Sequence, residues 1–172
     1  MLSGREIRRL ILEEGLVTGY LDLGLQVQPC GFDLSLESVE EFLGAGSVDF
    51  SNEERRLPET RKVDPSAKGW YTLPQGVYKV VYNETVKIPL NLVALAQTRS
   101  TLLRSGAQVA TAVWDPGYHG RSSSLLIVHN PHGLRLKRGA RIAQLVFFEA
   151  REVEEGYKGQ YQGERIQDFR NT

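Results

Sequence analysis

The pattern that most constrains the fold is a series of short strand-like runs, each closed by a turn signal. Such runs occupy residues 71–73, 77–82, 90–96, 108–114, 123–128 and 142–149, with glycine, proline or asparagine in the turns between them. Almost no helical periodicity accompanies them. Many short strands at this spacing predict a mainly β fold, either a sandwich or a jelly roll.

One short helix is expected at the N-terminus. Ser3 to Glu6 has the pattern of a capping box, in which the first and last side chains satisfy each other's backbone N–H groups. Ile7, Leu10 and Ile11 then fall on one helical face. We expect the helix to end by Gly15 and to pack against the domain, with no part in the chemistry.

Two further strands are predicted before this series. Residues 21–27 alternate as a half-buried strand would, and residues 32–36 resume after a turn. Cys30, in that turn, is expected to be a small buried filler. The runs at 71–73 and 77–82 are predicted to pair as a hairpin arm.

Residues 44–69 are polar, with several charges among glycine, serine, asparagine and proline. This composition indicates a long surface excursion with a brief extended piece around residues 48–50. Its charges are expected to be solvated, although such a loop can also cover a neighbouring subunit.

Length and charge set the frame for function. The 172 residues fit a single domain, and the 21 basic and 21 acidic residues give a formal net charge of zero. A nucleic-acid polymer is therefore not the expected partner, whereas a small anion needs only a local basic cluster. The lone Cys30 suits a reducing compartment, and neither a signal peptide nor a membrane span is recognisable, so a cytoplasmic protein is expected.

The most informative stretch is Thr111–Gly120, which reads TAVWDPGYHG. It places Asp115 between a strand-like approach and a Pro116-Gly117 turn, and a carboxylate there can act as a general base. The alternative is that Asp-Pro-Gly is ordinary turn chemistry.

Two other polar segments accompany Asp115. Residues 99–106 read RSTLLRSG, and a short helix starting after Arg99 would aim backbone N–H groups and the guanidinium at an anion. Residues 28–34 form a polar turn entering a strand. Asp33 within that strand is expected to be a structural hydrogen-bond partner that supports the nearby polar turns.

Four segments together carry a family resemblance. They are P-x-x-x-D-L from Pro29, R-S-T-L-x-R-x-G from Arg99, W-D-P-G-Y-x-G from Trp114 and G-x-R-I-A-Q-L from Gly139. In this order they resemble the dUTPase and dCTP deaminase superfamily, most closely an archaeal-type dUTPase with a deaminase-like chain. The resemblance implies a jelly-roll-like (β-clip) single domain over residues 1–172. It also implies a homotrimer with active sites at subunit interfaces, and a deoxynucleoside triphosphate bound with Mg2+.

The resemblance also assigns roles to residues. Asp115 would orient and deprotonate the attacking water, the backbone of Ala110 to Trp114 would read the pyrimidine, and Tyr118 would stack under the deoxyribose. Tyr118 also suits a core or interface position. The tail at about 154–172 is expected to be a mobile flap that contributes to binding. The full expected substrate-binding set is Arg99, Ser100, Thr101, Arg104, Thr111, Ala112, Val113, Trp114, Tyr118, Gln144, Tyr157, Lys158, Gln160 and Glu164.

One absence distinguishes the two reactions of the superfamily. Deamination of cytosine needs a second acid, which the deaminases place on the strand after D-P-G. Counting forward from Asp115 that position is Leu125, and counting back from Asn130 it is Ile127. We therefore expect a dUTP diphosphatase. The alternatives are a dCTP deaminase or bifunctional enzyme with another proton shuttle such as His129, and a nucleotide-binding module without turnover.

Overall fold

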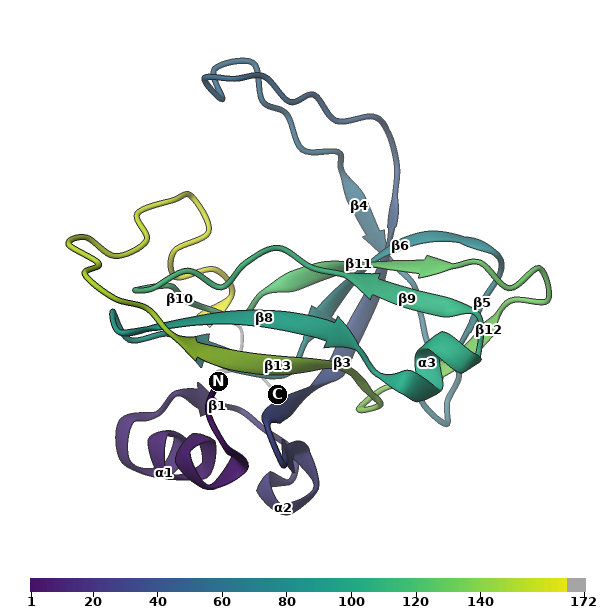
Figure 1. Cartoon of the computed structure of the whole chain (residues 1–172). Coiled ribbons are helices and arrows are strands. Elements are labelled where there is room, and N and C mark those ends of the chain that lie inside the picture. The colour runs from purple at the N-terminus through teal and green to yellow at the C-terminus, as the bar shows by residue number, and fades with distance from the viewer. Residues whose placement is uncertain (167–172) are drawn as a thin grey trace.

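The computed structural model describes residues 1–166 and is mainly β (Figure 1). Its helices are α1 (Gly4–Glu14), α2 (Leu23–Gln26) and α3 (Ser100–Arg104). Its strands are β1 (Val17–Thr18), β2 (Val27–Gln28), β3 (Gly31–Phe42), β4 (Thr60–Lys62), β5 (Trp70–Leu73), β6 (Gly76–Tyr82), β7 (Thr85–Lys87), β8 (Leu92–Thr98), β9 (Ala107–Ala110), β10 (His119–Gly120), β11 (Ser123–Val128), β12 (Leu134–Lys137) and β13 (Arg141–Glu149).

The main sheet runs in the order β8-β13-β3-β6-β11-β9, with β2 and β4 also paired to β3. Its two ends approach each other. The Thr98 hydroxyl on β8 donates to the Val109 carbonyl at 3.0 Å and accepts from the Val109 N–H at 2.9 Å. Ala94 and Trp114 form an isolated bridge beside this contact. The sheet is therefore curled into a barrel-like jelly roll, as predicted.

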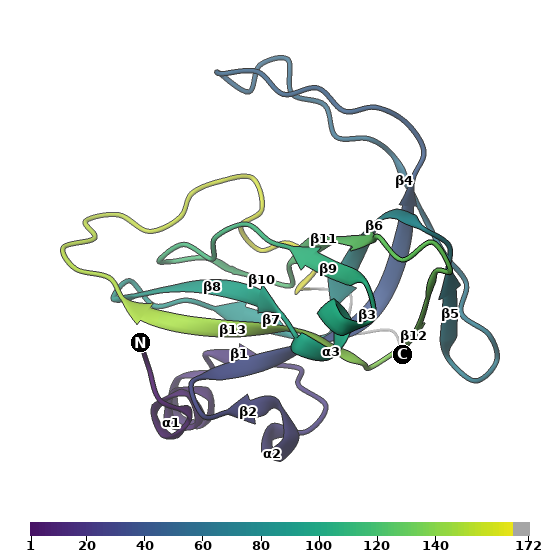
Figure 2. The same ribbon diagram turned by 45° about the vertical axis from the view of Figure 1, so that its right-hand side comes forward.

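The core lies inside this curled sheet because β3, β6 and β13 place apolar side chains on its inner face. The largest fully buried side chains are Tyr82, Phe32, Phe147, Ile7, Leu16, Leu34, Leu36, Leu73, Ile88, Leu126, Ile142 and Leu145. Figures 1 and 2 show α1 and α2 on one side of the sheet, opposite the side where the C-terminal tail lies.

The predicted N-terminal helix is confirmed. The Ser3 hydroxyl accepts from the Glu6 N–H at 3.4 Å, and the Glu6 carboxylate accepts from the Ser3 N–H at 2.8 Å. Gly15 ends the helix with a φ of 69°, in the left-handed region where glycine is favoured. Ile7 is fully buried against the domain.

The strand predicted over residues 21–27 is wrong, because most of that stretch is α2. The Asp22 carboxylate accepts from the Leu25 N–H at 2.9 Å and caps the helix. The buried Gln26 side chain accepts from the N–H groups of Leu21 and Asp22. These local side-chain bonds offer the backbone an alternative to a strand ladder.

Two further expectations are also corrected. Cys30 is exposed, because it lies in the tight turn that joins β2 to β3 and its side chain faces outward. The runs 70–73 and 76–82 do not form a hairpin with each other. Instead, β5 pairs with the distant β12, while β6 lies between β3 and β11 in the main sheet.

Residues 43–59 form a long arm that rises away from the sheet (Figures 1 and 2). Its two sides are joined near the sheet by a hydrogen bond from the Leu43 N–H to the Glu59 carbonyl (2.9 Å) and further out by a bridge between Ser47 and Arg56. The extended piece predicted at 48–50 therefore lies next to this bridge rather than in a strand. Val48 and Phe50, near the tip, are almost completely exposed.

Among residues 1–166, the model contains no helix long and apolar enough to cross a membrane.

Candidate active site

Asp115 is held in place by its backbone and its neighbours. The preceding Trp114 exchanges two backbone hydrogen bonds of 3.0 Å with Ala94 on β8, and its indole N–H donates to the Ser122 hydroxyl at 3.0 Å. The Asp115 carbonyl accepts from the Tyr118 N–H at 3.0 Å and closes a turn. Pro116 and Gly117 occupy the middle of that turn, and Gly117 has a φ of 84°, which suits glycine.

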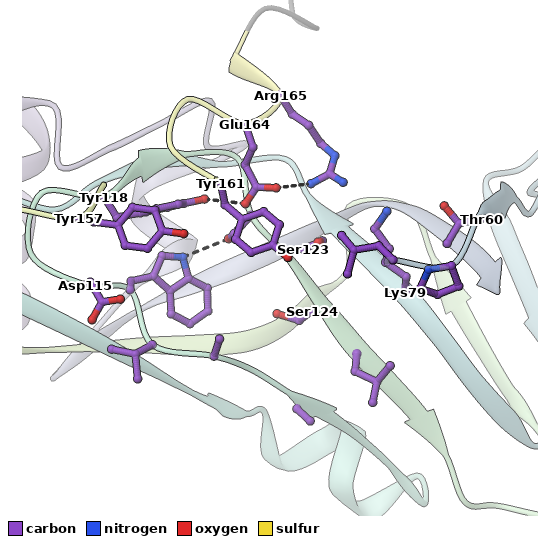
Figure 3. Close-up of a pocket in the computed structure, with 18 of the residues that line it drawn as sticks. Thr60, Lys79, Asp115, Tyr118, Ser123, Ser124, Tyr157, Tyr161, Glu164 and Arg165 are labelled. Carbon is purple, nitrogen blue, oxygen red and sulfur yellow. Dashed lines mark hydrogen bonds and ion pairs between the residues drawn. The ribbon is translucent and has the colours of Figure 1, made fainter. Parts of the chain in front are cut away.

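The Asp115 side chain is half-buried and lines a cleft of about 700 Å³. Within residues 1–166 its carboxylate makes no hydrogen bond or ion pair with the protein. The remaining lining comes from the chain at both ends of the arm, from β6, from the end of β9 and the loop that follows it, from the start of β11 and from the C-terminal tail. These residues are Phe42, Leu57, Pro58, Thr60, Lys79, Ala110, Ala112, Val113, Trp114, Tyr118, Ser122, Ser123, Ser124, Leu125, Tyr157, Tyr161, Glu164 and Arg165. Figure 3 shows the polar members around the opening.

The backbone beside Asp115 offers unused hydrogen-bonding groups. The predicted strand over residues 108–114 ends early, because β9 stops at Ala110 and Trp114 forms only the bridge to Ala94. In the described part of the chain, the peptide groups of Ala112 and Val113 make no backbone hydrogen bond. Both residues line the cleft, so their N–H and C=O groups are available to a ligand.

Tyr118 lies at the cleft wall and is 6% exposed. Its hydroxyl donates to Glu164 at 3.0 Å, and its ring meets Tyr157 edge-on with centroids 5.7 Å apart. Burial, and then the charge of Glu164, raise the pKa of Tyr118 well above its ordinary value. The phenol is therefore neutral and serves as a donor.

The two cations that line the cleft are both paired. The Lys79 ammonium lies 2.8 Å from the Glu40 carboxylate, and Arg165 lies 2.8 Å from Glu164. Burial alone would raise the pKa of Glu40, but hydrogen bonds from Lys79 and Thr60 hold it below its ordinary value. Burial raises the pKa of Glu164 even though Tyr118 and Arg165 oppose that rise.

The predicted phosphate-binding residues lie elsewhere. Arg99 precedes α3, and its Nε atom lies 3.0 Å from the buried Asp33 carboxylate, which Arg141 also contacts at 3.1 Å. Asp33 is therefore the buried structural partner that was predicted. Gln144 on β13 is the cross-strand neighbour of Asp33. In Figure 1 α3 lies at the carboxyl end of β8, while the tail crosses near the other end of that strand.

The structure thus divides the predicted set in two. Those that line the cleft with Asp115 are Ala112, Val113, Trp114, Tyr118, Tyr157 and Glu164. Those that do not are Arg99, Ser100, Thr101, Arg104, Thr111, Gln144, Lys158 and Gln160. Lys158 instead pairs with Glu155 at 2.7 Å, and Gln160 accepts a hydrogen bond from Arg55 on the arm.

Several lining residues were not predicted from the sequence. Ser122 to Ser124 enter β11 directly after the Asp115 turn, and a run of three hydroxyls there was a usable signal. Arg165 follows Glu164 in the tail. Lys79 and Thr60 gave no local signal, because only the pairing of β4 and β6 with β3 brings them to the cleft.

The two positions expected for the deaminase glutamate differ in their relation to the cleft. Leu125 lines the cleft, whereas Ile127 does not. His129 lies beyond the end of β11 and does not line the cleft either. Glu164 is therefore the one other carboxylate in the described lining.

Comparison with known proteins identifies the family of the chain. The family model described as dCTP deaminase-like matches residues 1–150. The chain belongs to the dCTP deaminase-like family. The resemblance noted from the four motifs is thereby confirmed.

Relatives within the dCTP deaminase-like family are close. A protein of Archaeoglobus fulgidus named "Probable deoxyuridine 5'-triphosphate nucleotidohydrolase" is 50% identical over 166 residues, covering 96% of this chain and 98% of its own. One of Methanosarcina mazei with the same name is 49% identical, covering 95% and 97%. The "Deoxyuridine 5'-triphosphate nucleotidohydrolase" of Methanocaldococcus jannaschii is 44% identical over 139 residues, or 80% of this chain and 88% of its own.

A solved structure shares the fold. The 2'-deoxycytidine 5'-triphosphate deaminase of Agrobacterium tumefaciens superposes with a TM-score of 0.68 and 24% identity, over 87% of this chain. The match covers 48% of that deaminase. At 24% identity, the likeness concerns the fold alone.

Proposed function

We propose that the protein is a dUTP diphosphatase that converts dUTP to dUMP and pyrophosphate. The observation that carries the proposal is the Asp115 carboxylate, which has no protein partner in the described chain and lines a nucleoside-sized cleft that has Leu125 where a deaminase needs an acid. Hydrolysis of a phosphoanhydride needs one base to activate water. The names of the archaeal relatives support the same reaction.

In this proposal Asp115 orients a water molecule and takes its proton as the water attacks the triphosphate. The free peptide groups of Ala112 and Val113 pair with uracil, which presents alternating donors and acceptors. The Tyr118 ring lies against the deoxyribose and leaves no room for a 2′-hydroxyl. Trp114 fixes the geometry, because its backbone and its indole are both bonded to the barrel.

The triphosphate requires cations that the cleft of one chain does not provide. Lys79 and Arg165, the two cations of the described lining, are both neutralised by carboxylates. Arg99 and Arg141 share the single Asp33 carboxylate, so this group keeps a net positive charge. With Arg104 and the hydroxyls of Ser100 and Thr101 it forms a second donor cluster around α3, away from the cleft. We infer that a second copy supplies this cluster, together with Gln144, and that the enzyme is a homotrimer with sites between subunits.

Magnesium would arrive with the substrate. The described residues contain no group of three or more acidic, histidine or cysteine side chains that would cage a metal ion. This donor set fits an ion that stays on the triphosphate oxygens and its own waters, as Mg2+ commonly does, with Asp115 as the nearby carboxylate. The ion would neutralise phosphate charge.

A second candidate is dCTP deamination, with or without hydrolysis. Glu164 favours it, because burial raises the pKa of this second carboxylate of the cleft and so suits it to proton transfer. Against this reading, both carboxylate oxygens are engaged, one by Tyr118 and the other by Arg165.

Paired assays decide between these functions. The purified protein is incubated with Mg2+ and either dUTP or dCTP, and both pyrophosphate and ammonia are measured. We expect pyrophosphate from dUTP and no ammonia from dCTP. Ammonia from dCTP would establish the deaminase. If neither substrate yields pyrophosphate or ammonia, a binding module without turnover is favoured.

A further inference from the structure

The C-terminal tail is bonded to the turn that carries Asp115. The tail here means residues 155–165, and it follows the chain from Pro116 to Arg121. Three backbone hydrogen bonds join the two segments: the Tyr157 N–H donates to the Pro116 carbonyl (2.7 Å), the Gly163 N–H to the His119 carbonyl (2.8 Å) and the Arg121 N–H to the Glu164 carbonyl (2.9 Å). The Gln162 side chain adds two more, because its amide nitrogen donates to the Gly117 carbonyl (3.0 Å) and its amide oxygen accepts from the His119 N–H (3.0 Å).

The innermost contact of the tail is with Tyr118 (Figure 3). Glu164 accepts the Tyr118 hydroxyl hydrogen through Oε1 at 3.0 Å, and its Oε2 atom lies 2.8 Å from Arg165. The site is closely fitted. A Cβ atom at Gly120 would lie 2.6 Å from the Tyr118 hydroxyl and 3.1 Å from the Glu164 Cγ atom.

We propose that Glu164 is a positioning residue that sets the preference for deoxyribose by holding Tyr118 in place. The proposal rests on the proposed function, in which the Tyr118 ring faces the sugar. It adds that the tail determines how strictly that ring excludes a ribonucleotide.

Two physical effects act in the same direction. A tyrosine hydroxyl has one hydrogen, and when Glu164 accepts it none remains to donate to a 2′-hydroxyl. The bond also fixes the ring, because Glu164 holds its hydroxyl while Tyr157 packs against it in a T-shaped contact. A ring released from Glu164 can turn aside and donate to the extra hydroxyl, which weakens the discrimination.

The test measures binding, so that it does not depend on turnover. Calorimetric titration with the α,β-imido analogues of dUTP and UTP gives two dissociation constants. The readout is the dissociation constant of the UTP analogue divided by that of the dUTP analogue. We expect Glu164→Leu to reduce this ratio about tenfold, the effect of one lost hydrogen bond to a charged group. Glu164→Gln keeps an acceptor oxygen and should retain most of the ratio.

Two further variants make the readout specific. Tyr118→Phe should lower the ratio less than Glu164→Leu does, because it frees the ring but leaves no hydroxyl to donate to the ribose. In the Tyr118→Phe protein, Glu164→Leu should cause no additional loss, because the bond that it removes is already absent. Glu154→Leu removes an exposed carboxylate just before the tail and should leave the ratio unchanged.

Two contrary results have different meanings. If Glu164→Leu weakens both analogues by the same factor, the role assigned to Glu164 is wrong while the proposed function stands. If the unmodified protein binds neither analogue, the proposed function itself fails.

Discussion

In the proposed function, Asp115 and Glu164 give the carboxylate group two different roles at a single cleft. Asp115 is half-buried at a turn and has no partner in the described chain, so its charge is available to a water molecule. Glu164 is engaged by Tyr118 and Arg165, so its oxygens are committed to holding other side chains. Environment, and not residue type, separates the base from the positioning residue.

At the residue scale, the sequence predicted which residues line the cleft better than it predicted which residues contact each other. Asp115 and Tyr118 were recognisable from their spacing in one motif, and both line the cleft. The partner of Tyr118 is 46 residues away in the chain, so no local pattern indicated it. Cys30 was mispredicted because short-range composition does not reveal which way a side chain points in a tight turn.

A buried acid outside the cleft gives a stability prediction. Glu84 is fully buried, and it accepts hydrogen bonds from the Gln26 amide at 2.6 Å and from the Ser35 hydroxyl and N–H at 2.6 and 2.9 Å. Burial raises its pKa despite these bonds. The folded protein therefore keeps this proton at pH values where the unfolded chain has lost it.

The raised pKa of Glu84 makes the free energy of unfolding depend on pH. The contribution of Glu84 to the free energy of unfolding is most favourable below the unfolded-state pKa and declines as pH rises through the folded-state pKa. Glu84→Gln should remove this decline. In urea denaturation across a pH series, the free energy of unfolding of the variant should therefore rise relative to that of the unmodified protein as pH increases. Glu59→Gln, an exposed change on the arm, is the control. A pH-independent difference for Glu84→Gln would contradict the prediction.

At the scale of elements, strand existence was predictable but strand pairing was not. β11 and β13 were predicted almost to the residue, because alternation along the chain is a local property. The partner of β5 is β12, some sixty residues later, and only the packed fold selects it. α2 was missed because it depends on the capping Asp22 and on the buried amide of Gln26, both side-chain contacts.

The contact between the tail and the Asp115 turn gives an element-scale prediction. A Cβ atom at Gly117 would lie 2.7 Å from the Gly156 Cα atom, at a backbone φ of 84°. Gly117→Ala should therefore displace the tail and destabilise the turn by more than about 1 kcal/mol. The expected result is faster limited proteolysis within residues 155–165 and weaker binding of the imido-dUTP analogue.

Gly44→Ala is the matched control, because open space surrounds that position and its φ is not positive. A Gly117→Ala protein whose tail is as protected as in the unmodified protein would show that the tail does not depend on this turn.

At the scale of the whole molecule, Asp115 and the Arg99 cluster lie apart in one chain, and the proposed function therefore takes its site from two copies. The sequence indicated both halves but not their separation, because linear order says nothing about which strand end each motif reaches. Arg99 follows β8, whereas Asp115 follows a bridge to the middle of that strand.

Mixed oligomers test this arrangement. Asp115→Asn and Arg99→Ala proteins should each be nearly inactive alone. Unfolded and refolded together in equal amounts, they should regain activity, because roughly a quarter of sites between randomly mixed copies combine an intact Asp115 with an intact Arg99. No recovery in demonstrably mixed oligomers would mean that each chain supplies its own complete site.

The central claim is that Asp115 acts as the base in dUTP hydrolysis, and the most direct measurement compares Asp115→Asn with the unmodified protein. The substitution keeps the size of the side chain and removes its basicity, so turnover of dUTP should fall roughly a hundred- to ten-thousand-fold. Calorimetric titration with the imido-dUTP analogue should give nearly unchanged binding, since the contacts proposed for the base and the sugar come from Ala112, Val113 and Tyr118 and not from Asp115. Near-normal dUTP turnover by the Asp115→Asn protein would contradict the claim.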